Sequence, residues 1–136
     1  MKEFSVVLAK RTEIAQLADL LGRNGINILT LAMEPDGGEG GRVHFVTSDD
    51  ATCRQLMRQK FDYSESEIIT ISIDDKPGSL ARLLSKLNRA SVGVNSIYII
   101  NRKNGRVEFV LGLQDVERGK TLLFEKLKLE KFSGSE

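Results

Sequence analysis

An internal repeat is the feature that most constrains how this chain can fold. Apolar residues recur at a constant offset of 66 positions, and the matched pairs are Ile14 with Leu80, Ala15 with Ala81, Leu17 with Leu83, Leu21 with Leu87, Ile26 with Val92, Ile28 with Val94, and Leu31 with Ile97. Farther on, the sequence at 105–110 matches that at 41–46 at an offset of 64, which indicates that only the intervening loop differs in length. The chain therefore contains two copies of one strand–helix–strand–strand–helix unit.

Alternating and amphipathic apolar patterns predict the elements of each copy. Thr12 is the expected N-cap of the first helix, and Gly25 is its expected end. The first copy is expected to have strands over 4–9, 26–31, 42–47 and 61–67, helices over 12–24 and 49–60, and a mobile glycine-rich hairpin over 34–41. The second copy is expected to have strands over 69–73, 92–100, 105–110 and 129–132 and a helix from Pro77.

This order predicts an α+β fold: two ferredoxin-like βαββαβ repeats, each an antiparallel sheet with its helices on one face. We place the domains at 1–66 and 67–136. Each copy is small for an independent core, so we expect the two to pack together. The short last strands would leave sheet edges that domain pairing or a homodimer can cover.

The turn before the helix of the second copy is the best candidate for a ligand site. Pro77 suits the first helical position, because the amide it lacks would have no partner there. Gly78 has no Cβ, so a ligand can approach its backbone closely. The free amides and the dipole of a helix start favour a bound carboxylate or phosphate.

The order of strand, turn, helix and strand around this turn resembles an ACT domain, and the turn reads Asp75-Lys76-Pro77-Gly78-Ser79-Leu80-Ala81. ACT domains are small regulatory modules of βαββαβ order that bind amino acids, usually as paired domains. Through the repeat, the resemblance covers nearly the whole chain as a tandem pair. It implies a regulator without enzymatic activity, cofactor or metal, whose ligand is an amino acid or a similar metabolite.

The resemblance also implies that the ligand lies where the turn of one domain meets the second strand of its neighbour, which usually begins Gly-Ile/Val-Asn. The first copy keeps Gly25-Ile26-Asn27, but its turn at 10–13 reads Lys-Arg-Thr-Glu in place of Asp-x-Pro-Gly. The second copy keeps the turn but has 91–93, Ser-Val-Gly, at its strand. We therefore expect one composite site per chain, with the turn facing Asn27. Glu13 stands where Gly78 would be, so its Cβ and carboxylate are expected to impair the reciprocal site.

Roles in that site follow from donor and acceptor chemistry. The amides of Gly78, Ser79 and Leu80 are expected to hold the ligand carboxylate. Asn27, or Asn95 and Ser96, would bond to the α-amino group, and Asp75 would supply its counter-charge. The full candidate set is Asp75, Lys76, Pro77, Gly78, Ser79, Leu80, Gly25, Ile26, Asn27, Asn95 and Ser96. The alternative is that Pro77 and Gly78 only start a helix and Asn27 only turns the chain.

Composition excludes several other classes of partner. Twenty basic and nineteen acidic residues give a net charge of +1, so nucleic acid and anionic membranes are not expected partners, although a local basic patch stays possible. No signal peptide and no stretch of about 20 apolar residues is visible. Cys53 is the one cysteine, which fits a reducing compartment, so we expect a cytoplasmic protein.

No catalytic constellation stands out. His44 is the one histidine, which argues against a catalytic triad or a histidine-rich metal site. Cys53 is expected to be a buried apolar residue. The glycines of 37–41 lack the Lys-Ser/Thr of a phosphate loop. RNA-recognition modules share the βαββαβ order, but each copy offers one phenylalanine, Phe45 or Phe109, where base stacking needs two or three aromatics.

These observations favour a stand-alone regulator that binds an amino acid between its domains and signals through a homodimer or a protein partner. The alternative is a ligand-free interaction module whose sites are relics. The turn at 75–80 separates the two, because a scaffold has no need to keep it. Gly78→Glu is expected to abolish binding with little loss of fold under the first hypothesis and to change nothing functional under the second.

Overall fold

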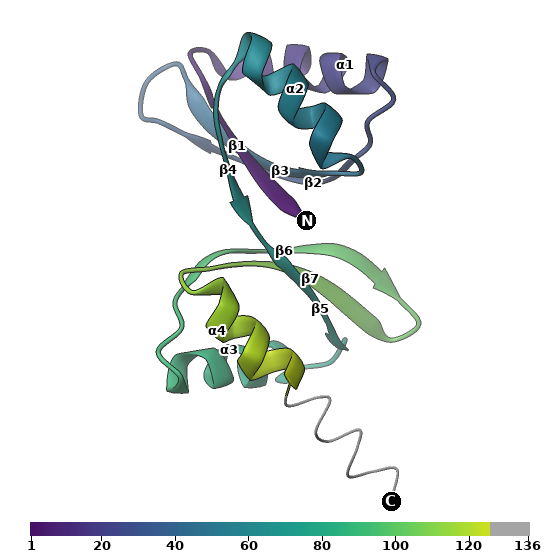
Figure 1. Ribbon diagram of the computed structural model, residues 1–136, viewed down its shortest axis with the longest axis vertical. Helices are drawn as coiled ribbons and strands as arrows, with labels where there is room; N and C mark the ends of the chain where they lie inside the picture. The colour runs from purple at the N-terminus through teal and green to yellow at the C-terminus, as the bar shows by residue number, and fades with distance from the viewer. Residues whose placement is uncertain (126–136) are drawn as a thin grey trace, which may run out of the picture. The chain divides into compact units, whose positions relative to one another are not determined.

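The computed structural model describes residues 1–125, which divide into two compact units (Figure 1). Unit 1 covers Met1–Glu67, and unit 2 begins at Ile68. Each unit has its own hydrophobic core. Among the described residues, no helix is long and apolar enough to cross a membrane.

Unit 1 is a complete βαββαβ fold. Its elements are β1 (Lys2–Leu8), the 3-10 helix η1 (Arg11–Glu13), α1 (Ile14–Arg23), β2 (Ile28–Pro35), β3 (Gly41–Thr47), α2 (Asp50–Lys60) and β4 (Asp62–Glu67). The strands form one antiparallel sheet in the order β2-β3-β1-β4, and both α-helices cover the same face of it (Figure 1). This is the ferredoxin-like arrangement that the sequence predicts.

Unit 2 repeats the same order. Its elements are β5 (Ile69–Asp74), α3 (Ser79–Arg89), β6 (Val94–Lys103), β7 (Arg106–Leu113), α4 (Val116–Lys120) and the π-helix η2 (Thr121–Glu125). The sheet is antiparallel in the order β5-β7-β6, which matches β1-β3-β2 of unit 1. The predicted last strand over 129–132 lies outside the described residues. The predicted fold class is confirmed.

The cores follow from the two periodicities of the sequence. Alternate residues of β1 and β5 point to the helices, and the apolar faces of α1 and α3 meet them. In α2, Cys53 is buried, as predicted, together with Met57, and Leu56 is partly buried. Gly25 follows the end of α1 with a φ of +71°, a left-handed conformation that glycine adopts without strain.

The strand register corrects one part of the repeat. Pairing is interrupted between Ile28 and Thr30 in unit 1 and between Val94 and Ser96 in unit 2, which is the same place at an offset of 66. Ile28 pairs with Thr47 and Val94 with Leu113, so the offset of 64 for the third strand is wrong. The error was possible because a shift of two residues leaves every side chain on the same face of a strand.

The start of α1 also differs from its prediction. Thr12 lies inside η1 and is not the N-cap, and Glu13 accepts a hydrogen bond from the Lys10 amide at 2.8 Å. The predicted mobile hairpin is anchored to the same segment, because Arg11 Nη1 donates to the carbonyl oxygens of Gly38 and Gly40 at 2.6 and 2.9 Å.

Candidate functional site

The candidate site is the turn that joins β5 to α3. Pro77 and Gly78 occupy the two central positions of a type II turn, because Gly78 has φ +90° and ψ −15° and the Ser79 amide donates to the Lys76 carbonyl at 3.2 Å. Helix α3 then begins at Ser79 with Gly78 as its N-cap. The prediction that Pro77 is the first helical residue is therefore wrong, because the Pro-Gly pair completes a turn ahead of the helix.

This turn exposes unpaired backbone donors. Within residues 1–125, the amides of Lys76, Gly78 and Leu80 have no hydrogen-bond partner, whereas the Ser79 amide is used inside the turn. The first turn of α3 contains no acidic residue. The donors at Gly78 and Leu80 that the sequence predicts are thus available to an anion, with Lys76 in addition and without Ser79.

The matching turn of unit 1 is closed by its own side chain. The Glu13 amide donates to the Lys10 carbonyl at 3.0 Å, as the Ser79 amide donates to the Lys76 carbonyl in unit 2. Glu13 therefore corresponds to Ser79 at the offset of 66, and the expected match of Glu13 with Gly78 is wrong by one position. The Glu13 carboxylate, however, already accepts the Lys10 amide. Unit 1 therefore fills with its own carboxylate the position that unit 2 leaves open.

The acidic residues of the turn are held by the β6–β7 hairpin. Asp75 pairs with Arg102 at 3.1 Å, and Asp74 pairs with Arg106 at 2.7 Å. The Asp75 amide also donates to the Gly105 carbonyl at 2.9 Å. A ligand ammonium at Asp75 would therefore share that carboxylate with Arg102.

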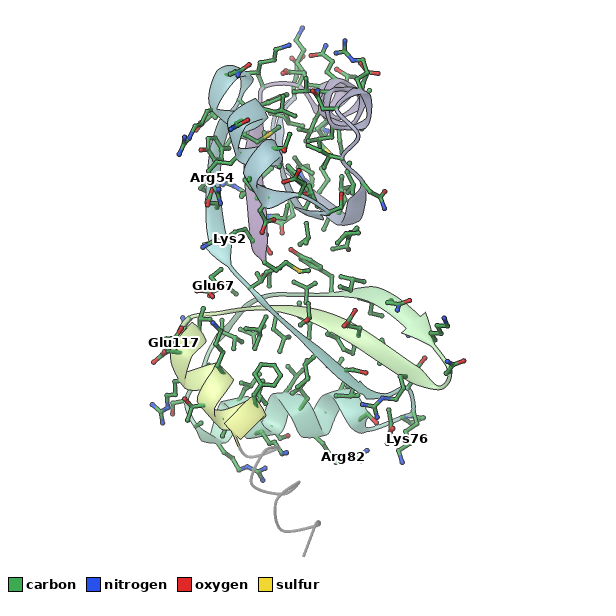
Figure 2. All side chains as sticks on the ribbon, turned by 45° about the vertical axis from the view of Figure 1, so that its right-hand side comes forward. Lys2, Arg54, Glu67, Lys76, Arg82 and Glu117 are labelled. Atoms are coloured by element: carbon green, nitrogen blue, oxygen red, sulfur yellow. The ribbon has the colours of Figure 1, made fainter. Side chains whose placement is uncertain are left out.

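Arg82 is a residue of this site that the sequence analysis missed. Its Nη2 donates to the Ser79 hydroxyl at 3.2 Å, and a Cβ added to Gly78 would lie 3.2 Å from its Nη1. Figure 2 labels Arg82 on α3 and Lys76 on the turn before it. The available signal was the composition of α3, which has three basic residues, Arg82, Lys86 and Arg89, and no acidic one.

The remaining candidates lie on other elements. In unit 1, Ile26 is buried in the core, and the backbone amide of the exposed Asn27 donates to the Ser48 hydroxyl at 3.0 Å. In unit 2, Asn95 is exposed on β6, and the Ser96 side chain fills the space where Gly112 lacks a Cβ. That any of these residues completes a site with the turn stays a prediction.

The described residues offer little support for a thiol nucleophile, a metal site or an RNA-stacking surface. Burial raises the pKa of the Cys53 thiol to about 12, so this group is not a nucleophile at neutral pH. Residues 1–125 contain no cluster of three or more potential metal ligands. Phe45 and Phe109 are buried in the cores, which removes them as base-stacking platforms for RNA.

The same tandem arrangement occurs in solved regulatory proteins. The regulatory subunit of aspartate kinase from Thermus thermophilus, in its ligand-free form, superposes with a TM-score of 0.66 at 12% identity over 90% of this chain and 87% of its own. The tandem ACT-type fold is confirmed. The subunit from Thermus flavus gives a TM-score of 0.61 at 11% identity, over 90% and 87% of the two chains.

A protein from Bacteroides thetaiotaomicron, BT0572, shares this ACT-type fold with a TM-score of 0.83 at 20% identity, over 92% of this chain and 87% of its own. No protein-family model and no curated protein matches the chain by sequence. The similarity therefore lies in the arrangement of elements, and at these identities it establishes the fold alone.

Proposed function

We propose that this chain is a regulatory protein, not an enzyme, that senses a small molecule, and that its ligand is an amino acid bound at the turn 75–80. Its fold is shared along most of its length with regulatory subunits of aspartate kinase, one of them described as a ligand-free form. An amino acid has the carboxylate that unpaired amides at a helix start favour.

The contrast between the two turns is the observation that carries this proposal. In unit 1 the Glu13 carboxylate satisfies the Lys10 amide, and in unit 2 the corresponding Lys76 amide has no partner among the described residues. A ligand carboxylate would accept a hydrogen bond from the Lys76 amide, as the Glu13 carboxylate accepts one from the Lys10 amide. This supports one working turn per chain.

The substitution Ser79→Glu tests the proposal, and urea unfolding of the variant must accompany it because Ser79 is buried. This change copies Glu13 into unit 2 at the matching position, so the new carboxylate is expected to bond the Lys76 amide and to close the turn. Titration calorimetry should show one amino acid bound per chain for the natural protein and none for Ser79→Glu.

Ser85→Glu is the matched control, because Ser85 is exposed on the same helix and corresponds to Asp19 of unit 1. It adds the same charge away from the turn, and binding should persist. Unchanged binding in Ser79→Glu would contradict the proposal.

A homodimer in the cytoplasm completes the proposal. Strands β2 and β6 each form one edge of their sheet and carry exposed apolar side chains, Leu29 and Leu31 on β2 and Val94 and Ile99 on β6. Such edges are available for pairing with another chain. The single buried cysteine is compatible with a reducing compartment.

A further inference from the structure

A cavity of about 310 Å³ lies beside α3 in unit 2. Its polar lining consists of Ser72, Asp74, Ser79, Arg82, Lys86 and Arg106, and its apolar lining consists of Ile71, Ile73, Leu83 and Leu123. Three side chains in it are cationic and one is anionic, which gives a local net charge of about +2 in a chain whose total is +1.

Two of the three cations have no counter-charge among residues 1–125. Arg106 is held by Asp74 at 2.7 Å and by the Ser72 carbonyl at 2.9 Å. Arg82 bonds only the neutral Ser79 hydroxyl, and neither Arg82 nor Lys86 forms an ion pair with another described residue. Two cations without an ion pair in the described part of the chain thus line the same cavity, beside an arginine that Asp74 already holds in position.

The first repeat shows that the fold does not need these charges. A cavity of unit 1 overlaps only part of the corresponding place, because it is lined by Glu13, Gln16 and Leu20 but by no residue of β1. At the offset of 66, Gln16 corresponds to Arg82 and Leu20 to Lys86, and Leu20 is only 8% exposed. Unit 2 therefore places a lysine where unit 1 buries a leucine in its core.

From this charge pattern we infer that the cavity of unit 2 binds a phosphate monoester. A phosphate group carries a charge of about −1.5 to −2 near neutral pH, which complements the local charge better than a single carboxylate does. Arginine and lysine are the usual phosphate-binding side chains, and the two serine hydroxyls add neutral donors. The apolar walls would contact the organic part of the ligand.

This cavity shares Ser79 and Arg82 with the candidate site at the turn. Phosphate binding is measured without any amino acid present, so either proposal can fail while the other holds. The first probe is inorganic phosphate, titrated by calorimetry at constant ionic strength, because phosphate also stabilises proteins without binding to them. The natural protein should bind it, and Arg82→Gln/Lys86→Gln should bind it at least about tenfold more weakly, since each lost charged hydrogen bond is worth about that factor.

The control variant Arg89→Gln/Arg118→Gln removes two charges from the same unit outside the cavity, and its phosphate affinity should stay within about twofold of the natural value, as expected when only screened surface charge changes. Phenyl phosphate should bind more tightly than inorganic phosphate because its ring meets the apolar walls. The affinity for phenyl phosphate should also fall below about pH 6, where a phosphate monoester loses its second charge. The inference would be overturned if both double variants lost phosphate affinity equally or if the natural protein bound no phosphate. Tighter binding of succinate than of phosphate would overturn it as well.

Discussion

At the scale of single residues, the backbone of Gly78 determines the shape of the candidate site. Its φ of +90° is a conformation that other residues adopt only with strain, and it lets the turn close with the Ser79 amide bonded to the Lys76 carbonyl. The expectation that Gly78→Glu leaves the fold nearly intact therefore needs correction. Any side chain at this position strains the turn and also meets Arg82.

Gly78→Ala should lower the free energy of unfolding by about 1–2 kcal/mol, the cost of a left-handed conformation for a residue with a Cβ. Gly22→Ala is the control, because Gly22 lies in α1 with open space around it. This substitution should stabilise the protein by about 0.5–1 kcal/mol. Urea unfolding measures both changes. Equal effects of the two substitutions would contradict the turn geometry.

The sequence predicted the position of the turn but not its partners. Pro77 and Gly78 mark a turn through their own backbone preferences, which are local and can be recognised without a structure. Arg82 and Arg102 act through contacts with Ser79 and Asp75, and Arg102 lies 27 positions from Asp75 along the chain. Contacts of that separation depend on the hairpin register, and the predicted offset of the third strand was wrong by two residues.

At the scale of elements, α2 and β4 are joined by a bidentate ion pair. Arg54 Nε and Nη2 donate to the Glu65 carboxylate at 2.8–3.0 Å, and Figure 2 shows Arg54 beside β4. These hydrogen bonds hold the pKa of Glu65 below its ordinary value of 4.5. The unfolded state therefore takes up this proton at a higher pH than the folded state does.

Glu65→Gln should destabilise unit 1 at pH 7 and lose that effect in acid. The contribution of Glu65 is fully present above about pH 4.5 and disappears as the pH falls through the lowered pKa of the folded state. Urea unfolding of both proteins at pH 7 and at successively lower pH measures the difference. Glu39→Gln is the matched control for the loss of one charge, because Glu39 lies on the exposed hairpin of the same unit, away from the ion pair.

Most elements could be predicted because their apolar periodicity is strong and repeated. The exceptions lie at helix starts, where one or two side-chain hydrogen bonds decide between start positions of similar energy. Thr12 is the predicted N-cap, but the Lys10 amide donates to the Glu13 carboxylate instead. The shifted alignment of the third strands arose because period-two patterns cannot distinguish registers two residues apart.

At the scale of the whole molecule, the proposal requires a homodimer. Light scattering should give about twice the chain mass of 15.1 kDa. Leu31→Lys and Ile99→Lys place a charge on the edge strands β2 and β6, and the variant that yields the monomer mass identifies the paired edge. A monomer mass for the natural protein at micromolar concentration would contradict this part of the proposal.

Thermal unfolding against the twenty amino acids tests the central claim most directly. An added dye reports unfolding, because the chain has no tryptophan. A ligand at 100 times its dissociation constant should add about 2.7 kcal/mol of stability, for one or a few amino acids. The shift should vanish in Ser79→Glu and persist in Ser85→Glu. No shift for any amino acid with the natural protein, or the same shift with Ser79→Glu, would contradict an amino-acid sensor built on the turn at 75–80.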